Sequence, residues 1–136
     1  MRITDEVLRV NARYAHHFTL GQLALPPARQ RAVVTCMDAR LMVDHILGLQ
    51  AGDAHIIRNA GGIVTEDAQR SLLLSHHLRG TQEFMIINHT DCGMSTFKDE
   101  EARAQLHQLM GTATWRRSTS IRSATWKRTS ASRCRK

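Results

Sequence analysis

The sequence has no apolar segment approaching the ~20 residues that a membrane-spanning helix needs. No apolar stretch follows the charged residues 1–6, so the N-terminus does not resemble a secretion signal. Cysteine is scarce and odd in number, at positions 36, 92 and 134, which argues against a disulfide framework. These absences predict a cytoplasmic protein without membrane contact, whose thiols stay reduced and can act as metal ligands or nucleophiles.

Acidic side chains are absent from residues 112–136, which hold eight of the 19 basic residues of this 136-residue chain. The 11 remaining basic residues nearly balance the 12 acidic ones, so the formal charge of +7 comes from the tail and says nothing about a substrate of residues 1–111. We expect one domain over residues 1–111 and an irregular basic tail over residues 112–136.

Helical and strand patterns alternate along the first 110 residues. Helices are predicted over residues 4–20, 41–48 and 65–80, with a fourth beginning near Ser95. Strands are predicted over residues 31–35, 54–58 and 83–88. The alternation predicts an α/β fold with a parallel-core β-sheet flanked by helices.

Local signals refine this scheme. Thr4 and Thr65 are the expected N-caps of the first and third helices, and Gly48 and Gly80 are expected to end the second and third. The continuous apolar run over residues 84–87 predicts a strand that is buried on both faces.

Two chemically rich segments directly follow predicted strands. Cys36-Met37-Asp38-Ala39-Arg40 follows the first strand, and His89-Thr90-Asp91-Cys92 follows the third. In an extended backbone alternate side chains point the same way, so Cys36, Asp38 and Arg40 can share one side. Since parallel strands end at one edge of the sheet, where α/β proteins bind ligands, we expect these two segments to meet there.

Two cysteines and one histidine are a donor set that suits zinc. Three protein ligands leave a fourth position open for water, as in catalytic zinc sites, although Cys134 in the tail is a conceivable fourth ligand. Asp38 can accept a hydrogen bond from such a water or bind the metal itself, and Arg40 would keep it ionised and oriented.

Two other uses of Cys36 fit the sequence poorly. A cysteine-dependent phosphatase would need an arginine six positions later and glycines in between, but position 42 is methionine and residues 37–41 contain no glycine. A Cys-x-x-Cys redox motif is also absent.

Three motifs occur together in this order: Cys36-x-Asp38-x-Arg40, Arg58-Asn59-Ala60-Gly61-Gly62 and His89-x-x-Cys92-Gly93. Together they closely resemble the β-class carbonic anhydrases, and most of all their small bacterial branch, over about residues 1–110. The resemblance implies a zinc enzyme with one Zn²⁺ per chain that interconverts carbon dioxide and bicarbonate. It also implies a homodimer or a higher oligomer.

The resemblance further implies individual roles. Cys36, His89 and Cys92 match the zinc ligands of the family, and Asp38 and Arg40 match its catalytic dyad. In some family members the residue matching Asp38 becomes a fourth zinc ligand and closes an inactive state.

The second motif matches a family stretch close to the active site. The resemblance therefore implies that Asn59, Ala60, Gly61 and Gly62 line the pocket. A glycine pair in this position is otherwise explained by a simple turn.

The unusual tail leaves three interpretations of the whole chain open. We favour an active carbonic anhydrase, and the alternatives are a zinc-binding but inactive remnant and a protein whose basic tail binds nucleic acid or an anionic surface. The abrupt change of composition after Gly111 also resembles translation in a wrong reading frame, so we hypothesise a frameshift there.

Overall fold

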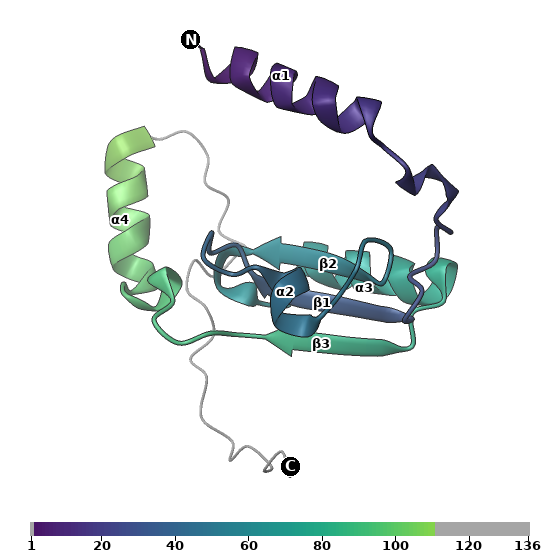
Figure 1. The fold of residues 1–136 in the computed structure, drawn as a ribbon. Coiled ribbons are helices and arrows are strands. Elements are labelled where there is room, and N and C mark those ends of the chain that lie inside the picture. Colours follow the sequence, from purple (N-terminus) through teal and green to yellow (C-terminus); the bar gives the residue numbers. More distant parts are fainter. Residues whose placement is uncertain (1, 111–136) are drawn as a thin grey trace.

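The computed structural model describes residues 2–110. Its centre is a sheet of three parallel strands in the order β2-β1-β3, formed by β1 (Arg31–Cys36), β2 (Ala54–Asn59) and β3 (Glu83–Ile87). Both neighbours pair with β1 from its first residue, so all three strands end at the same edge (Figure 1). The parallel sheet and its flanking helices confirm the predicted fold class.

The central strand is buried because it is paired on both edges and rich in small and β-branched side chains. Ala32, Val33 and Val34 are almost completely inaccessible. Thr35 is also buried, and its hydroxyl donates a hydrogen bond of 2.9 Å to the Ile87 carbonyl. A hydroxyl satisfied in this way can be buried at little cost.

Two helices cover opposite faces of the sheet (Figure 1). They are α2 (Val43–Leu47) and α3 (Glu66–Arg79). As predicted, Thr65 caps α3 by accepting a hydrogen bond from the Ala68 N–H, and Gly48 and Gly80 end the two helices in the left-handed conformation.

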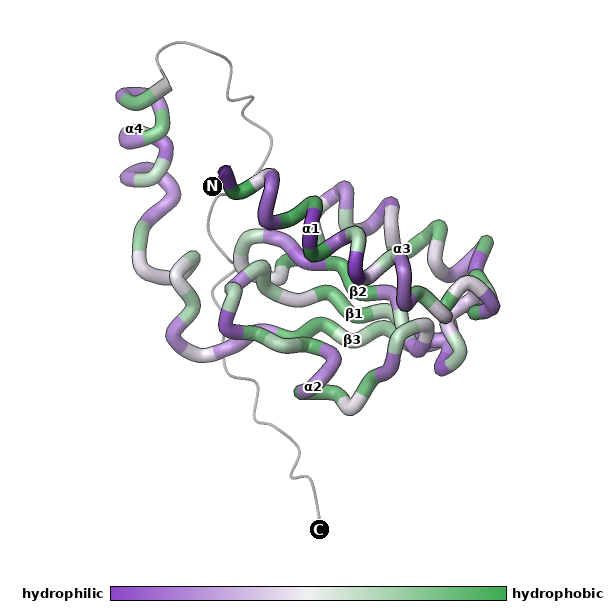
Figure 2. The backbone as a smooth tube through the Cα atoms, turned by 45° about the horizontal axis from the view of Figure 1, so that its top comes forward, coloured by the Kyte–Doolittle hydropathy of each residue, from purple (hydrophilic) through white to green (hydrophobic). Residues whose placement is uncertain are grey.

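The remaining helices project from this body. They are α1 (Ile3–His16) and α4 (Asp99–Met110), and Figure 1 shows both standing away from the sheet. No residue of α1 is buried, and hydrophobic and hydrophilic residues both occur along it (Figure 2). Short 3₁₀ turns complete the fold at Leu20–Gln22, Ala60–Gly62 and Gly93–Ser95.

The predicted bounds of the first helix need correction. It ends at His16 rather than residue 20, and its N-cap is Arg2 rather than Thr4. Asp5 accounts for the earlier start, because its carboxylate accepts a hydrogen bond of 3.2 Å from the Arg2 N–H.

The fourth helix begins at Asp99, later than the predicted start near Ser95. The Ser95 and Thr96 hydroxyls donate to the Cys92 and Gly93 carbonyls, both at 2.7 Å. These local bonds hold the segment in a turn and compete with helix formation.

The prediction that β3 is buried on both faces is wrong. Phe84 is 46% exposed and Ile86 is 53% exposed. In the described part of the chain β3 is an edge strand, and Phe84 stays half-exposed although its ring meets that of His76 on α3 at 6.0 Å between centroids.

Two predictions fall beyond residue 110. The basic tail over residues 112–136, including Cys134 as a conceivable ligand, lies outside the described residues, as does the frameshift hypothesis. Among residues 2–110, no helix combines the length and the apolar character that crossing a bilayer requires.

Candidate metal centre

The three candidate ligands converge at the carboxyl edge of the sheet. Cys36 is the last residue of β1, while His89 and Cys92 lie in the loop that follows β3. One potential ligand atom from each lies within 4.8 Å of the other two. The structure therefore brings together residues that are more than 50 positions apart in the sequence, as the strand order predicts.

Several features of this group suit a metal ion. The Cys36 and Cys92 sulfurs lie 3.8 Å apart and both side chains are buried. His89 Nε2 is also buried and has no hydrogen-bond partner within residues 2–110, and such an atom is costly unless something binds it. Two thiols and an imidazole nitrogen around one point are donors that zinc prefers.

The two thiols are held in different electrostatic environments. Burial raises the pKa of Cys36, but the His89 imidazole and the backbone N–H groups of Asp38 and Gly61 outweigh it, so that the pKa lies below its ordinary value. Burial raises the pKa of Cys92, and the neighbouring Cys36 raises it further. A cation between the sulfurs would offset the repulsion between two thiolates and so favour the ionised form of both cysteines.

Asp38 and Arg40 form a bidentate ion pair beside the ligands. Arg40 Nη2 donates to Asp38 Oδ2 at 2.8 Å, Arg40 Nε donates to Asp38 Oδ1 at 3.0 Å, and the Arg40 N–H donates to the same Oδ1 at 2.9 Å. The Arg40 side chain and then its N–H hold the pKa of Asp38 far below its usual range. Asp38 is therefore a carboxylate at neutral pH.

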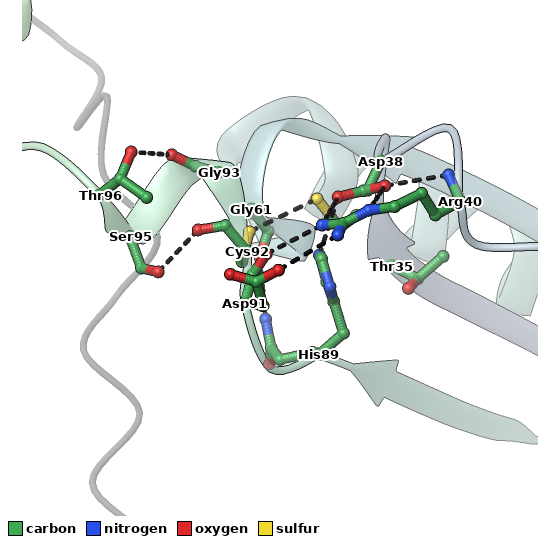
Figure 3. Close-up of polar contacts among 12 residues, drawn as sticks. Thr35, Asp38, Arg40, Gly61, His89, Asp91, Cys92, Gly93, Ser95 and Thr96 are labelled. Carbon is green, nitrogen blue, oxygen red and sulfur yellow. Dashed lines mark hydrogen bonds and ion pairs between the residues drawn. The ribbon is translucent and has the colours of Figure 1, made fainter.

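This carboxylate faces the point where the ligands converge. Asp38 Oδ2 lies 3.9 Å from His89 Nε2, and both side chains are only 15% exposed. Figure 3 shows the imidazole of His89 directed towards the carboxylate. A group bound between the three ligands would thus meet a hydrogen-bond acceptor.

The turn over residues 59–62 packs directly on the end of β1. A Cβ added to Gly62 would lie 2.8 Å from the Cys36 nitrogen, and the φ angle of Gly62 is +63°. Gly62 is therefore required both by its backbone conformation and by the closeness of Cys36. The Asn59 amide group closes the turn by bonding to the N–H and carbonyl of Ile63 at 2.9 and 2.6 Å.

The four residues predicted to line the pocket occupy different positions in this turn. Gly61 and Gly62 are buried against the ligand cluster, and the Gly61 N–H interacts with Cys36. Ala60 is half-buried in the same turn. Asn59, by contrast, directs its side chain to Ile63 and supports the turn.

Two residues to which sequence reasoning gave no role hold the site from the neighbouring strands. Arg58 donates to the Cys36 carbonyl at 3.0 Å and to the Asp38 carbonyl at 2.6 Å. Asn88 donates to the Gly61 carbonyl at 2.8 Å and so joins the end of β3 to the glycine turn. Arg58 stands inside the second motif and Asn88 directly precedes the third, and this placement at strand ends is the sequence signal that could have revealed their roles.

A Cys-His-Cys cluster beside a paired carboxylate, at the carboxyl edge of a parallel sheet, is the arrangement expected of a metal-dependent α/β enzyme. Comparison with known proteins narrows this class. The carbonic anhydrase family model matches residues 31–134, and the chain belongs to this family. Its similar proteins place it in the β class.

Beta-carbonic anhydrase 1 of Mycobacterium tuberculosis (strain ATCC 25618 / H37Rv) is 47% identical over 111 residues, which are 82% of this chain and 68% of that protein. The crystal structure of a carbonic anhydrase from Streptococcus mutans has a TM-score of 0.73 and 46% identity, over 81% of this chain and 66% of that one. A carbon disulfide hydrolase of Acidianus sp. (strain A1-3) is 52% identical over 77 residues, 57% of this chain and 38% of that protein. The chain thus spans about two thirds of the length of its carbonic anhydrase relatives.

Replacing Gly62 by alanine tests the close packing of the glycine turn on Cys36. We expect Gly62→Ala to lower the free energy of unfolding by about 2 kcal/mol more than Gly48→Ala, measured by urea denaturation. Gly48 is a matched control, because its φ is +60° but its added Cβ would meet nothing within 4 Å. Both variants pay the left-handed penalty of about 1–2 kcal/mol, and only Gly62→Ala also meets the backbone of β1. Equal losses in the two variants would contradict this account.

Proposed function

We propose that the chain binds one Zn²⁺ through Cys36, His89 and Cys92 and catalyses the reversible hydration of carbon dioxide to bicarbonate and a proton. The observation that carries the proposal is the convergence of three ligand atoms within 4.8 Å, beside a carboxylate already held by an arginine. The membership of the chain in the carbonic anhydrase family supports it.

Zinc in this position supplies a Lewis acid that lets water act as a nucleophile near neutral pH. The role of Asp38 is to accept a hydrogen bond from the nucleophile. This bond orients the nucleophile so that a lone pair on its oxygen faces the carbon of carbon dioxide. Arg40 keeps Asp38 ionised, so Asp38 accepts at physiological pH. The new C–O bond gives bicarbonate, and the proton passes to solvent.

Asp38 is therefore proposed to act as an acceptor rather than a fourth ligand in this conformation. Both of its oxygens receive hydrogen bonds from Arg40. Coordination of the metal by Asp38, the alternative that the family resemblance raises, would compete with these bonds for the same carboxylate.

The glycine turn is proposed to border the substrate. Gly61 and Gly62 are buried, and Gly62 packs directly on the Cys36 backbone, so the turn forms a wall beside the ligand cluster. Ala60 adds a methyl group to this wall, and Asn59 holds the turn in shape through Ile63.

Carbon disulfide hydrolysis is a second candidate activity, because a carbon disulfide hydrolase shares 52% identity over 77 residues of this chain. Carbon disulfide has the same linear shape as carbon dioxide, and the same groups could direct water at its carbon. We favour carbon dioxide, because the identity with a beta-carbonic anhydrase extends over 111 residues. Assays with each substrate separate the two.

Zinc content tests the ligand set directly. We expect the purified chain to contain one zinc per chain and Cys36→Ser to contain almost none, measured by elemental analysis after gel filtration, since an alcohol is a far poorer zinc ligand than a thiolate. Cys134→Ser is the matched control and should keep its zinc. Full zinc in Cys36→Ser would refute the ligand assignment.

Stopped-flow hydration of carbon dioxide tests the role of Asp38. Asp38→Asn should keep one zinc per chain but lose roughly 100-fold in kcat/KM, because an amide is a weaker acceptor and can present its NH₂ to the nucleophile. The control Asp44→Asn changes an exposed acid on α2 and should keep the parental rate. One zinc without hydration in the parent chain would favour the inactive remnant, and full activity in Asp38→Asn would exclude the catalytic role.

Assembly into a homodimer or higher oligomer is the remaining part of the proposal. Its support is α1, where Ile3, Val7, Val10 and Tyr14 recur at helical spacing and are all exposed. An exposed apolar stripe of this kind usually marks an interaction surface.

Sedimentation velocity measures the assembly. We expect the parent chain to sediment as a dimer or larger species and Val7→Lys to shift it towards monomer, because a buried ammonium group without a partner is costly. Ala12→Lys places the same group on the opposite face of α1 and should leave the assembly unchanged. A monomeric parent chain, or an unchanged Val7→Lys variant, would contradict the proposal.

A further inference from the structure

Asp91 lies between two of the proposed ligands, His89 and Cys92, and contacts Arg40 in two ways. Its Oδ2 lies 3.2 Å from Arg40 Nη1, and its backbone carbonyl accepts a hydrogen bond of 2.9 Å from Arg40 Nη2. The guanidinium group thus sits between two carboxylates, Asp38 and Asp91 (Figure 3). Neither the fold nor the ligand set accounts for the second one.

The backbone at Asp91 makes this double contact possible. Its φ is +55°, and among residues 2–110 only Gln30 is another non-glycine residue with a positive φ. Aspartate and asparagine tolerate this conformation better than most residues do. The left-handed turn allows the carbonyl and the side chain of one residue to face the same guanidinium group.

The contact with Asp91 ties Arg40 to a different segment of the chain. Asp38 and Arg40 are only two residues apart, so their mutual ion pair can move with the loop that carries both. Arg58 fixes this loop through the Asp38 carbonyl, but it does not touch the guanidinium group of Arg40 in any described hydrogen bond. Asp91 supplies the link between that group and the loop after β3.

A long side chain that is 64% exposed, as Arg40 is, samples many rotamers unless it is anchored. Asp91 is itself 86% exposed, and an ion pair so open to solvent adds little to folding stability. Its effect should therefore fall on the orientation of Arg40, and through Arg40 on Asp38, more than on the fold.

We propose that Asp91 is a positioning residue that acts through Arg40 to hold the Asp38 carboxylate towards the cluster of Cys36, His89 and Cys92. The consequence for catalysis rests on the proposed function, whereas the consequence for Arg40 itself does not.

The test uses the full chain and three single variants. Asp91→Gly removes the carboxylate but keeps the positive φ and the carbonyl. Asp91→Asn keeps an oxygen acceptor and the backbone conformation but removes the charge. Glu83→Gln is the control, because Glu83 forms an exposed ion pair with Arg31 at 2.6 Å on β3, outside the site.

Two readouts follow the variants. The first is the Arg40 Nε–H resonance in ¹⁵N spectra, assigned by its loss in Arg40→Gln, which reports whether the guanidinium group is held. The second is kcat/KM for hydration, normalised to zinc content. We expect Asp91→Gly to broaden the Arg40 signal and to lose roughly tenfold in kcat/KM, at the low end of the range for residues that orient metal-site groups. Asp91→Asn should lose roughly threefold, and Glu83→Gln should match the parent in both readouts.

A double variant separates positioning from general damage. If Asp91 acts through Arg40, adding Asp91→Gly to Arg40→Gln should cause no further loss of kcat/KM. A further tenfold loss in the double variant, or an unchanged Arg40 signal in Asp91→Gly, would overturn the proposal. If Asp91→Gly does not fold, an unchanged Arg40 signal together with an unchanged kcat/KM in Asp91→Asn would overturn the proposal.

The two proposals fail in different ways. A parent chain without hydration activity would refute the proposed function, but the Arg40 signal would still show whether Asp91 holds the guanidinium group. Full hydration by the parent chain, together with an Arg40 signal that ignores Asp91, would refute the positioning role alone.

Discussion

The parallel pairing of β1 with both neighbours is the constraint on which the site depends. The register aligns Cys36 with Asn59 on β2, and Thr35 with Ile87 on β3, so the segments that follow all three strands emerge together. The side chains of Ala32, Val33 and Val34 make β1 a buried and rigid support. The sheet therefore positions the ligands, and the loops only have to present them.

The carboxyl edge of the sheet also has to balance the charges of the groups that it brings together. Two thiols that would both be ionised by a metal lie beside the carboxylate of Asp38, and so much negative charge within a few ångströms is unfavourable without cations. Arg40 neutralises Asp38 on the solvent side. Arg58 donates to backbone carbonyls of the same loop, which places a second guanidinium group near the cluster. A divalent cation between the sulfurs would offset the negative charge that remains.

Most of the architecture could be predicted, because strands and helix ends carry local signals. These signals act on the backbone at their own position. They include the β-branched residues before Cys36, the threonine at position 65 and the glycines at positions 48 and 80. The exposure of Phe84 could not be predicted, since it depends on what covers β3. The contacts of Arg58 and Asp91 could not be predicted either, because hydrogen bonds to partners 20 or 51 positions away follow no sequence period.

The ligands of the candidate centre belong to two different strand ends, and Cys36 and Cys92 are 56 positions apart. They become neighbours only after β3 has docked beside β1, which is a slow, long-range event compared with forming a helix. A metal ion bound to both would close a loop of that length. The conformational entropy of closing this loop is already lost when β3 pairs with β1, so metal binding does not have to lower it again. Metal uptake at this site would therefore also report on folding. Only molecules whose central sheet is complete would capture the cation, and the bound cation would then oppose the opening of that sheet.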